Sequence, residues 1–227
     1  MGALHDDPLL IANVEAILAA LKPEVVIETG TFRGTTTEWF AQRVPVVLTC
    51  EIREDFADAA EARFREAKLK NITIFRGPSQ HRIGAMLMAA RDLGGACLVY
   101  LDAHWQDDWP LMAELIACFR ARGQLFNGFL AVIIDDFQVP GRTGFSAPDG
   151  GGGTVGDAMY GPKSVQGGIP ADLRHFWPVL ESWALRFPAY DGPAIGYAIA
   201  LGAGALRAVE EAGGLPYAEL PRGGPPQ

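Results

Sequence analysis

Short apolar runs alternate with amphipathic stretches along the first 137 residues of this chain. Five runs rich in Val, Ile and Leu have the length of buried strands, and they cover residues 25–29, 46–51, 72–75, 96–101 and 129–134. Before and between them, apolar positions recur with helical spacing at residues 8–21, 35–43, 55–68, 79–93 and 111–122. Because the strands are separated by helices, the pattern predicts an α/β fold built on a mostly parallel sheet.

The alternation ends after Phe137, where glycine becomes frequent. The run PGRTGFSAPDGGGGTVGDAMYGPKSVQGG disfavours regular structure and is longer than an ordinary connection. We interpret residues 138–168 as a lid over a site, and a disordered surface insertion is the alternative interpretation. Further on, residues 183–187 and 195–201 have the pattern of two closing strands.

These patterns predict a single domain covering residues 1–227. Its expected parts are a leading helix (1–22), a core with a glycine turn (23–137), the glycine-rich lid or insertion (138–168), closing strands with a helix (169–212) and a flexible Pro/Gly-rich tail (213–227).

Composition and charge narrow the functional classes. The chain is 49% hydrophobic and 20% charged, which suffices for a full core without disulfides. The odd number of cysteines, with Cys97 and Cys118 inside apolar patterns, favours a reducing cytoplasm. A net charge of −8 without a basic stripe argues against nucleic acid as a partner, and no apolar run is long enough to span a membrane. We therefore expect a cytoplasmic protein that acts on a small molecule.

Acidic residues follow two of the predicted strands. Asp102 ends VYLD in VYLDAHW, and Asp135 and Asp136 follow AVII in AVIIDDF. The carboxyl ends of parallel strands share one edge of a sheet, so the three carboxylates are expected to lie together. Oxygen ligands of this kind suit Mg²⁺ or another hard divalent cation better than a Cys/His site would. The alternative is that individual aspartates cap the helix or turn that follows.

His104 lies two residues after Asp102, on the same expected edge. With an ordinary pKa of about 6.5, it is a candidate general base for a hydroxyl substrate. It can equally orient Asp102 or bind a loop carbonyl. The other histidines, His5, His81 and His175, have no pattern that predicts a partner.

The segment VIETGTFRGTTT joins the first strand to its helix. Gly30 permits a tight turn there, and Gly34 lets a ligand or neighbouring backbone approach the helix N-terminus. Glu51, about 20 residues further on, ends the second strand, at a separation that suits an acid binding ribose hydroxyls. The glycine spacing differs from G-x-G-x-x-G, which disfavours NAD and makes a nicotinamide oxidoreductase a distant alternative.

The acid-x-Gly-x-x-x-Gly pattern followed by Glu51 resembles that of class I S-adenosylmethionine-dependent methyltransferases, over residues 23–137. More narrowly, LDAHW and IIDDF resemble the metal-dependent macrocin O-methyltransferase and cephalosporin-hydroxylase-like group, and catechol O-methyltransferase has a similar metal arrangement. The resemblance implies a Rossmann-like, mostly parallel seven-stranded sheet with an antiparallel last strand and helices on both faces. It implies cofactor binding by Glu28, Gly30, Thr31, Arg33, Gly34, Glu51 and Ser79, and metal binding by Asp102, Asp135 and Asp136.

One segment departs from the family pattern. Many class I enzymes have an acid after the third strand that contacts adenine, whereas this chain reads RGPSQH with Pro78 at that place. Ser79 or Gln80 can supply the hydrogen bond instead.

We therefore expect an S-adenosylmethionine-dependent, Mg²⁺-assisted O-methyltransferase that acts on a hydroxyl of a small polar acceptor, such as a sugar or specialised metabolite. Two alternatives stay open: a metal-independent methyltransferase with His104 as its base, and a non-catalytic module that binds S-adenosylmethionine. A homo-oligomer is possible, because apolar residues of the leading helix can form a dimer face or cover the sheet.

Overall fold

A computed structural model describes residues 2–103, 110–137, 173–189 and 196–220. Five parallel strands form its centre: β1 (Val25–Thr29), β2 (Val46–Glu51), β3 (Ile72–Arg76), β4 (Cys97–Leu101) and β5 (Leu130–Ile134). Every residue of β1, β4 and β5 is buried. Strands covered on both faces need apolar side chains at successive positions, which is why these runs are continuous in the sequence.

The sheet has the strand order β3-β2-β1-β4-β5-β7-β6-β8. β7 (Ala198–Leu201) runs antiparallel between β5 and β6 (Ala184–Pro188). The seven expected strands are thus confirmed, with the seventh antiparallel to its neighbours. A two-residue strand, β8 (Ala218–Glu219), adds an eighth by pairing with β6, and it lies in the segment for which a tail was predicted.

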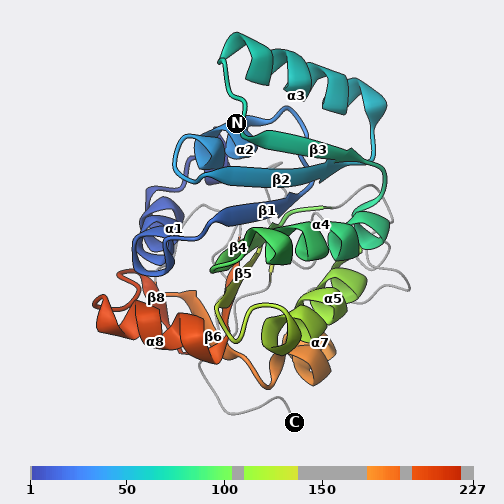
Figure 1. The fold of residues 1–227 in the computed structure, drawn as a ribbon. Coiled ribbons are helices and arrows are strands. Elements are labelled where there is room, and N and C mark those ends of the chain that lie inside the picture. Colours follow the sequence, from blue (N-terminus) through green and yellow to red (C-terminus); the bar gives the residue numbers. More distant parts are fainter. Residues whose placement is uncertain (1, 104–109, 138–172, 190–195, 221–227) are drawn as a thin grey trace, which may run out of the picture.

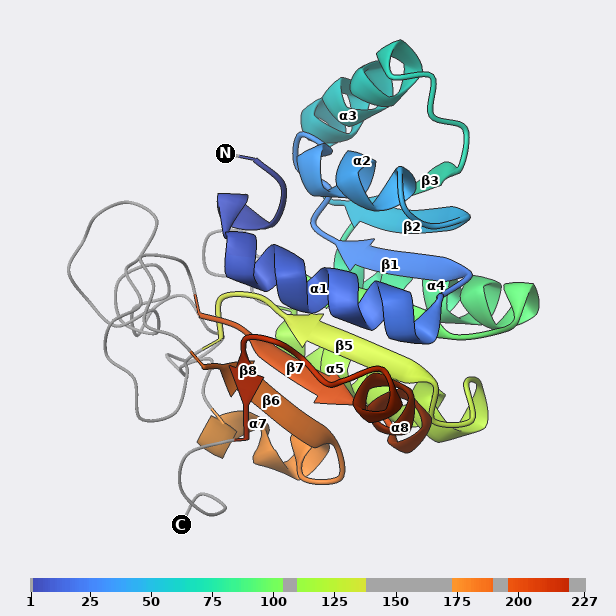
Figure 2. The same cartoon turned by 90° about the vertical axis from the view of Figure 1, so that its left-hand side faces the viewer.

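Helices cover both faces of the sheet, as expected (Figures 1 and 2). One apolar cluster joins α1 (Pro8–Leu21), α2 (Thr35–Ala41) and α8 (Ala203–Glu211) to one face. A second cluster joins three other helices to the other face: α4 (Ser79–Leu93), α5 (Leu111–Gln124) and α7 (Leu173–Leu180). Neighbouring strand residues alternate between the two clusters, because successive side chains of a strand point to opposite faces.

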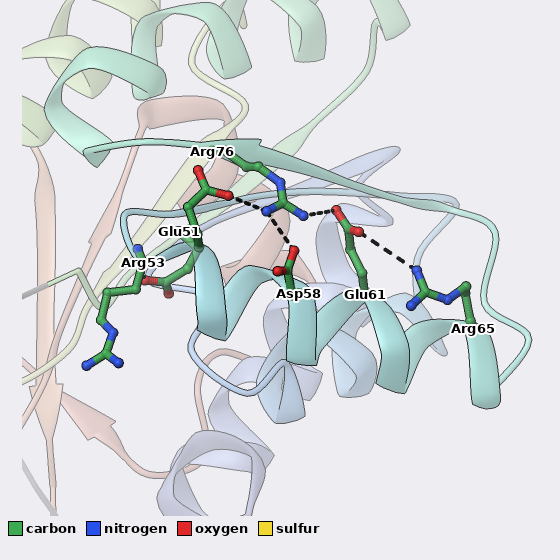
Figure 3. A network of polar contacts seen from close by, with 7 residues as sticks. Glu51, Arg53, Asp58, Glu61, Arg65 and Arg76 are labelled. Carbon is green, nitrogen blue, oxygen red and sulfur yellow. Dashed lines mark hydrogen bonds and ion pairs between the residues drawn. The ribbon is translucent and has the colours of Figure 1, made fainter.

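The helix α3 (Glu54–Glu66) lies along the edge strand β3, where ion pairs connect the two elements (Figure 3). The Arg76 guanidinium is 2.8 Å from Asp58 and 2.7 Å from Glu61, and it also contacts Glu54. Such exposed pairs contribute little stability individually. These ion pairs instead set the position of the Arg76 side chain. Arg76 is paired in register with Glu51 of β2, but its guanidinium lies against the acids of α3.

Two further expectations concern the fold as a whole. The cysteines Cys50, Cys97 and Cys118 are buried free thiols, which agrees with the apolar patterns around Cys97 and Cys118 and with the absence of a predicted disulfide framework. Within the part of the chain that the structure describes, no helix is both long enough and apolar enough to cross a membrane.

An acid lies in the apolar layer beneath α5. Glu114 is fully buried, and neither of its carboxyl oxygens has a hydrogen-bond partner of good geometry among the described residues. Burial raises the pKa of Glu114 to about 7, and the nearby hydroxyls of Ser79 and Thr29 offset only part of this effect. The folded protein therefore holds a proton on Glu114 that the unfolded chain releases near pH 4.5.

This difference predicts a pH dependence of stability. Because the pKa of Glu114 is higher in the folded state, its favourable contribution is complete below about pH 4.5 and is lost as the pH rises to about 7. The full effect is about 3 kcal/mol, at 1.36 kcal/mol per pH unit. Urea unfolding at pH 5 and pH 8 should show that Glu114→Gln loses less stability over this interval than the wild type.

Glu211→Gln, at an exposed acid on α8, is the matched control and should keep the wild-type pH dependence. Glu28 titrates in the same range but is present in all three proteins, so its effect cancels from the comparison. Parallel curves for Glu114→Gln and the wild type would contradict the buried-acid explanation.

Candidate functional site

The register of three central strands aligns two of the candidate acids. Thr29, Leu101 and Ile134 end β1, β4 and β5 side by side in the sheet. The backbone ladder continues for one more residue, since the Asp102 N–H donates to Thr29 O at 3.2 Å and the Asp135 N–H donates to Leu101 O at 2.9 Å. The expectation that Asp102 and Asp135 meet at the carboxyl edge is confirmed.

The glycine turn after β1 fits closely against its surroundings. Gly30 has φ +87°, and a Cβ built there would lie 2.5 Å from the carbonyl oxygen of Asp102. Gly34 has φ +77°, and its Cβ would lie 2.6 Å from the ring of Phe64 on α3. The N–H groups of Gly30 and Thr31 both donate to Cys50 O at 3.0 Å, which fixes the turn to β2. Only glycine combines these conformations with such close approaches.

Glu28 lies beneath this turn and is almost completely buried. Its Oε2 accepts hydrogen bonds from the hydroxyls of Thr37 and Thr49, the latter at 2.7 Å. Thr49 also contacts the Thr31 hydroxyl at 2.7 Å, so Glu28 is connected to the buried Thr31 of the turn. Burial raises the pKa of Glu28 to about 7, against the opposing effect of the two threonine hydroxyls. This environment makes Glu28 a support of the turn.

Glu51 connects the turns that follow β1 and β2. Its Oε2 accepts from the Phe32 N–H at 2.7 Å, and its Oε1 accepts from the Arg53 N–H at 2.9 Å. A carboxylate has about four acceptor positions, so both oxygens keep capacity for donors of a ligand. Phe32 and Ile52 belong to these two turns and expose 47% and 45% of their surface. Exposed apolar surface is therefore present next to the Glu51 carboxylate.

The other two predicted cofactor residues have different environments. Arg33 is exposed, and its guanidinium carbon lies 5.3 Å from the ring centre of Phe32. Ser79 is buried at the first position of α4, and its hydroxyl has no hydrogen-bond partner of good geometry among the described residues.

Asp102 and Asp135 share their place with a histidine that the sequence pattern did not indicate. One potential ligand atom each from His5, Asp102 and Asp135 lie within 4.8 Å of one another. The His5 Nε2 contacts Asp135 Oδ2, which also accepts from the buried Tyr100 hydroxyl at 2.8 Å. Asp136 is buried beside them with φ +53°, but it is not part of this group among the described residues. The structure therefore groups two of the three predicted metal-binding aspartates with His5.

The electrostatics of this cluster distinguish its members. Burial raises the pKa of Asp102 well above its ordinary value, and the neighbouring charges of Asp135 and Asp136 raise it further. Burial acts in the same direction on Asp135, but His5 and the Tyr100 hydroxyl hold its pKa below the ordinary value. For His5, burial lowers the pKa, yet the charge and hydrogen bond of Asp135 raise it to about 9.

No pattern in the sequence predicted a partner for His5, whereas the structure places its imidazole against Asp135. His5 and Asp135 are separated by 130 residues, and no spacing rule connects a single histidine to a strand end so far away. Close to His5 in the sequence, Asp7 caps the helix that begins at Pro8, and its side chain accepts from the N–H groups of Leu9 and Leu10. His104 and the predicted lid, residues 138–168, lie outside the described residues.

Comparison with solved structures identifies the architecture. A candidate O-methyltransferase from Klebsiella pneumoniae matches with a TM-score of 0.52 at 18% identity, over 87% of this chain and 82% of that chain. A candidate caffeoyl-CoA O-methyltransferase from Staphylococcus aureus matches with a TM-score of 0.51 at 14% identity, over 86% and 83%. The fold is that of Rossmann-like methyltransferases. An rRNA methylase from Streptococcus thermophilus shares it with a TM-score of 0.50 at 12% identity, over 88% and 99%.

These methyltransferase-fold neighbours differ widely in the acceptors that their names state. At such low identities the likeness establishes the fold, and the reaction has to be argued from the site itself. Comparisons with protein-family models and with curated protein sequences give no match.

The tight contact at Gly30 generates a prediction. Gly30→Ala forces a Cβ against the Asp102 backbone at a positive φ, so we expect the free energy of unfolding to fall by roughly 2 kcal/mol or more. Gly84→Ala is the control, because Gly84 lies within α4 and its added Cβ has nothing within 4 Å. This second change should raise stability by up to about 1 kcal/mol through helix propensity. Urea unfolding measures both, and equal stability of Gly30→Ala and wild type would contradict the close approach.

Proposed function

We propose that this chain is an S-adenosylmethionine-dependent O-methyltransferase that methylates a hydroxyl of a small polar acceptor with the help of a divalent cation. The observation that carries the proposal is that the turn containing Glu51 and the Asp102–Asp135 pair lie at the same edge of the sheet. The Glu51 turn suits a nucleoside cofactor, and the aspartate pair suits a hydroxyl acceptor. The fold shared with proteins named as O-methyltransferases supports this assignment.

The residues around the glycine turn fit the parts of the cofactor. Glu51 can accept hydrogen bonds from ribose hydroxyls, because its oxygens retain acceptor capacity after binding two backbone N–H groups. Ile52 offers an exposed apolar side chain next to it for the adenine ring. Ser79 has a hydroxyl without a protein partner of good geometry in the described part of the chain, suited to a polar atom of adenine. When bound, S-adenosylmethionine supplies a methyl group activated by the adjacent sulfonium.

The acidic cluster fits a divalent cation by two observations. Asp135 Oδ1 is buried and has no hydrogen-bond partner among the described residues. Buried carboxylate oxygens normally have a partner, so this oxygen is able to bind a ligand such as a cation. Asp102 lies with Asp135 and His5 at ligand spacing, and its pKa is raised by burial and, in addition, by the negative charges of Asp135 and Asp136. A cation such as Mg²⁺ at Asp102 and Asp135, with Asp136 adjacent, would acidify a bound hydroxyl and hold its oxygen towards the methyl group.

Methyl transfer also requires a place for the acceptor's proton. As the new C–O bond forms, the C–S bond breaks with its electron pair moving to sulfur, and the hydroxyl proton leaves to a base. His104 remains our proposed base, on the connection between β4 and α5. Its position two residues after Asp102 would keep the base beside the oxygen that reacts.

A metal-independent methyltransferase is the second candidate function. The specific observation in its favour is the contact between His5 and Asp135, because an imidazolium there compensates one carboxylate without a metal. Turnover that is insensitive to a chelator would favour this alternative, and cofactor binding without turnover on a broad panel of hydroxyl acceptors would favour a non-catalytic module.

The first test measures binding of S-adenosylhomocysteine by calorimetry. Glu51→Gln replaces a charged acceptor by an amide, so we expect the dissociation constant to increase roughly tenfold to a hundredfold, as for the loss of one hydrogen bond to a charged group. Glu66→Gln, an exposed acid at the end of α3, is the matched control and should bind as the wild type does. Absence of binding to the wild type would reject the methyltransferase proposal.

A further inference from the structure

The N-terminal turn η1 (Ala3–Asp6) has an unusual backbone conformation. Leu4, His5 and Asp6 have φ values of +50°, +58° and +58°, and none of them is glycine. Each such residue costs roughly 1 kcal/mol or more relative to ordinary backbone, so the surrounding structure has to hold the turn in place. Figure 2 shows the turn beside the sheet edge at which β1 and β5 end.

Contacts on both sides of His5 hold this turn. Leu4 is completely buried in the apolar cluster of α1 and α2, and its N–H donates to the Thr36 hydroxyl at 3.3 Å. Asp7 closes the turn through its N–H to Leu4 O at 3.1 Å and caps α1 with its side chain. The anchored residues on either side direct the His5 imidazole to the acidic cluster.

The contact with Asp135 leaves part of both groups unsatisfied. Asp135 Oδ2 already accepts from His5 and Tyr100, whereas Asp135 Oδ1 and His5 Nδ1 are buried without hydrogen-bond partners among the described residues. Asp135 is 3% exposed, so water reaches its carboxylate poorly. With Asp102 at ligand spacing, the cluster presents two carboxylates and one imidazole around a common point. A single imidazolium cannot balance two carboxylates, whereas a dication can.

We infer that His5 is a nitrogen ligand of the cation site at Asp102 and Asp135, and that this site selects a first-row transition-metal dication over Mg²⁺. Imidazole suits Fe²⁺, Ni²⁺, Cu²⁺ and Zn²⁺, whereas Mg²⁺ prefers oxygen ligands and retained water. Mn²⁺ also favours oxygen, but it accepts a nitrogen ligand more readily than Mg²⁺ does and is therefore the most stringent first-row probe. This inference rests on the proposed function only for the presence of a cation at this sheet edge. It corrects the preference for Mg²⁺ that the aspartates alone suggest.

The test uses the full-length chain and two metals, MnCl₂ and MgCl₂, titrated by calorimetry. We expect Mn²⁺ to bind at least about tenfold more tightly than Mg²⁺. His5→Gln should lose roughly tenfold or more of the Mn²⁺ affinity, since even indirect partners of metal ligands contribute tenfold to a hundredfold. His5→Glu, which supplies oxygen in place of nitrogen, should retain a cation but lose the preference for Mn²⁺. His81→Gln on α4 is the control and should behave as the wild type.

A spectroscopic measurement separates coordination from support of the turn. Pulsed electron paramagnetic resonance of the Mn²⁺-loaded protein detects directly bound nitrogen. We expect the nitrogen modulation in the wild type and in His81→Gln, and its loss in both His5 variants. Modulation that persists in His5→Gln, or equal binding of the two metals by the wild type, would overturn the inference.

The same samples distinguish this inference from the proposed function. Binding of S-adenosylhomocysteine without any metal binding would overturn the role of His5 and leave the methyltransferase proposal in its metal-independent form. Nitrogen-coordinated Mn²⁺ without binding of S-adenosylhomocysteine would support the metal site and reject the proposed reaction.

Discussion

The parallel register of β1, β4 and β5 is the constraint on which the site depends. Each of the two strand pairs continues its ladder by one hydrogen bond, from Asp102 to Thr29 and from Asp135 to Leu101. Two acidic residues that are distant in sequence are thereby fixed side by side at the end of a buried sheet. The same edge receives the glycine turn, since a Cβ at Gly30 would meet the Asp102 backbone. The proposed cofactor and cation positions are therefore mechanically connected.

Charge that is buried without full compensation is concentrated around this edge. Glu28 and Glu114 lie on opposite faces of the sheet, and burial raises the pKa of both to about 7. Burial also raises the pKa of Asp102, and the charges of its acidic neighbours act in the same direction. Burial of carboxyl groups lowers the free energy of unfolding, so several of them near one edge make the fold less stable than apolar residues at the same positions would. Perturbed pKa values of this kind are typical of functional sites, although structural networks produce them as well.

The N-terminal turn illustrates how strain and packing act together. The left-handed residues of η1 are unfavourable locally, but burial of Leu4 and the cap made by Asp7 stabilise their conformation. The result is a histidine placed against Asp135 from outside the sheet. A rigid strand end and a strained terminal turn thus contribute to one cluster.

The parallel sheet and the meeting of Asp102 with Asp135 could be predicted from the sequence, because hydrophobic periodicity is local and the carboxyl ends of parallel strands share an edge. The sequence also located β1 correctly at residues 25–29. The contact between His5 and this edge arises in the folded chain, since it joins positions 130 residues apart and needs positive φ values at three successive residues that no local pattern predicts. The burial of Glu114 also became evident in the folded structure, because the helical pattern of α5 does not predict how closely α4 and the sheet surround a single polar position.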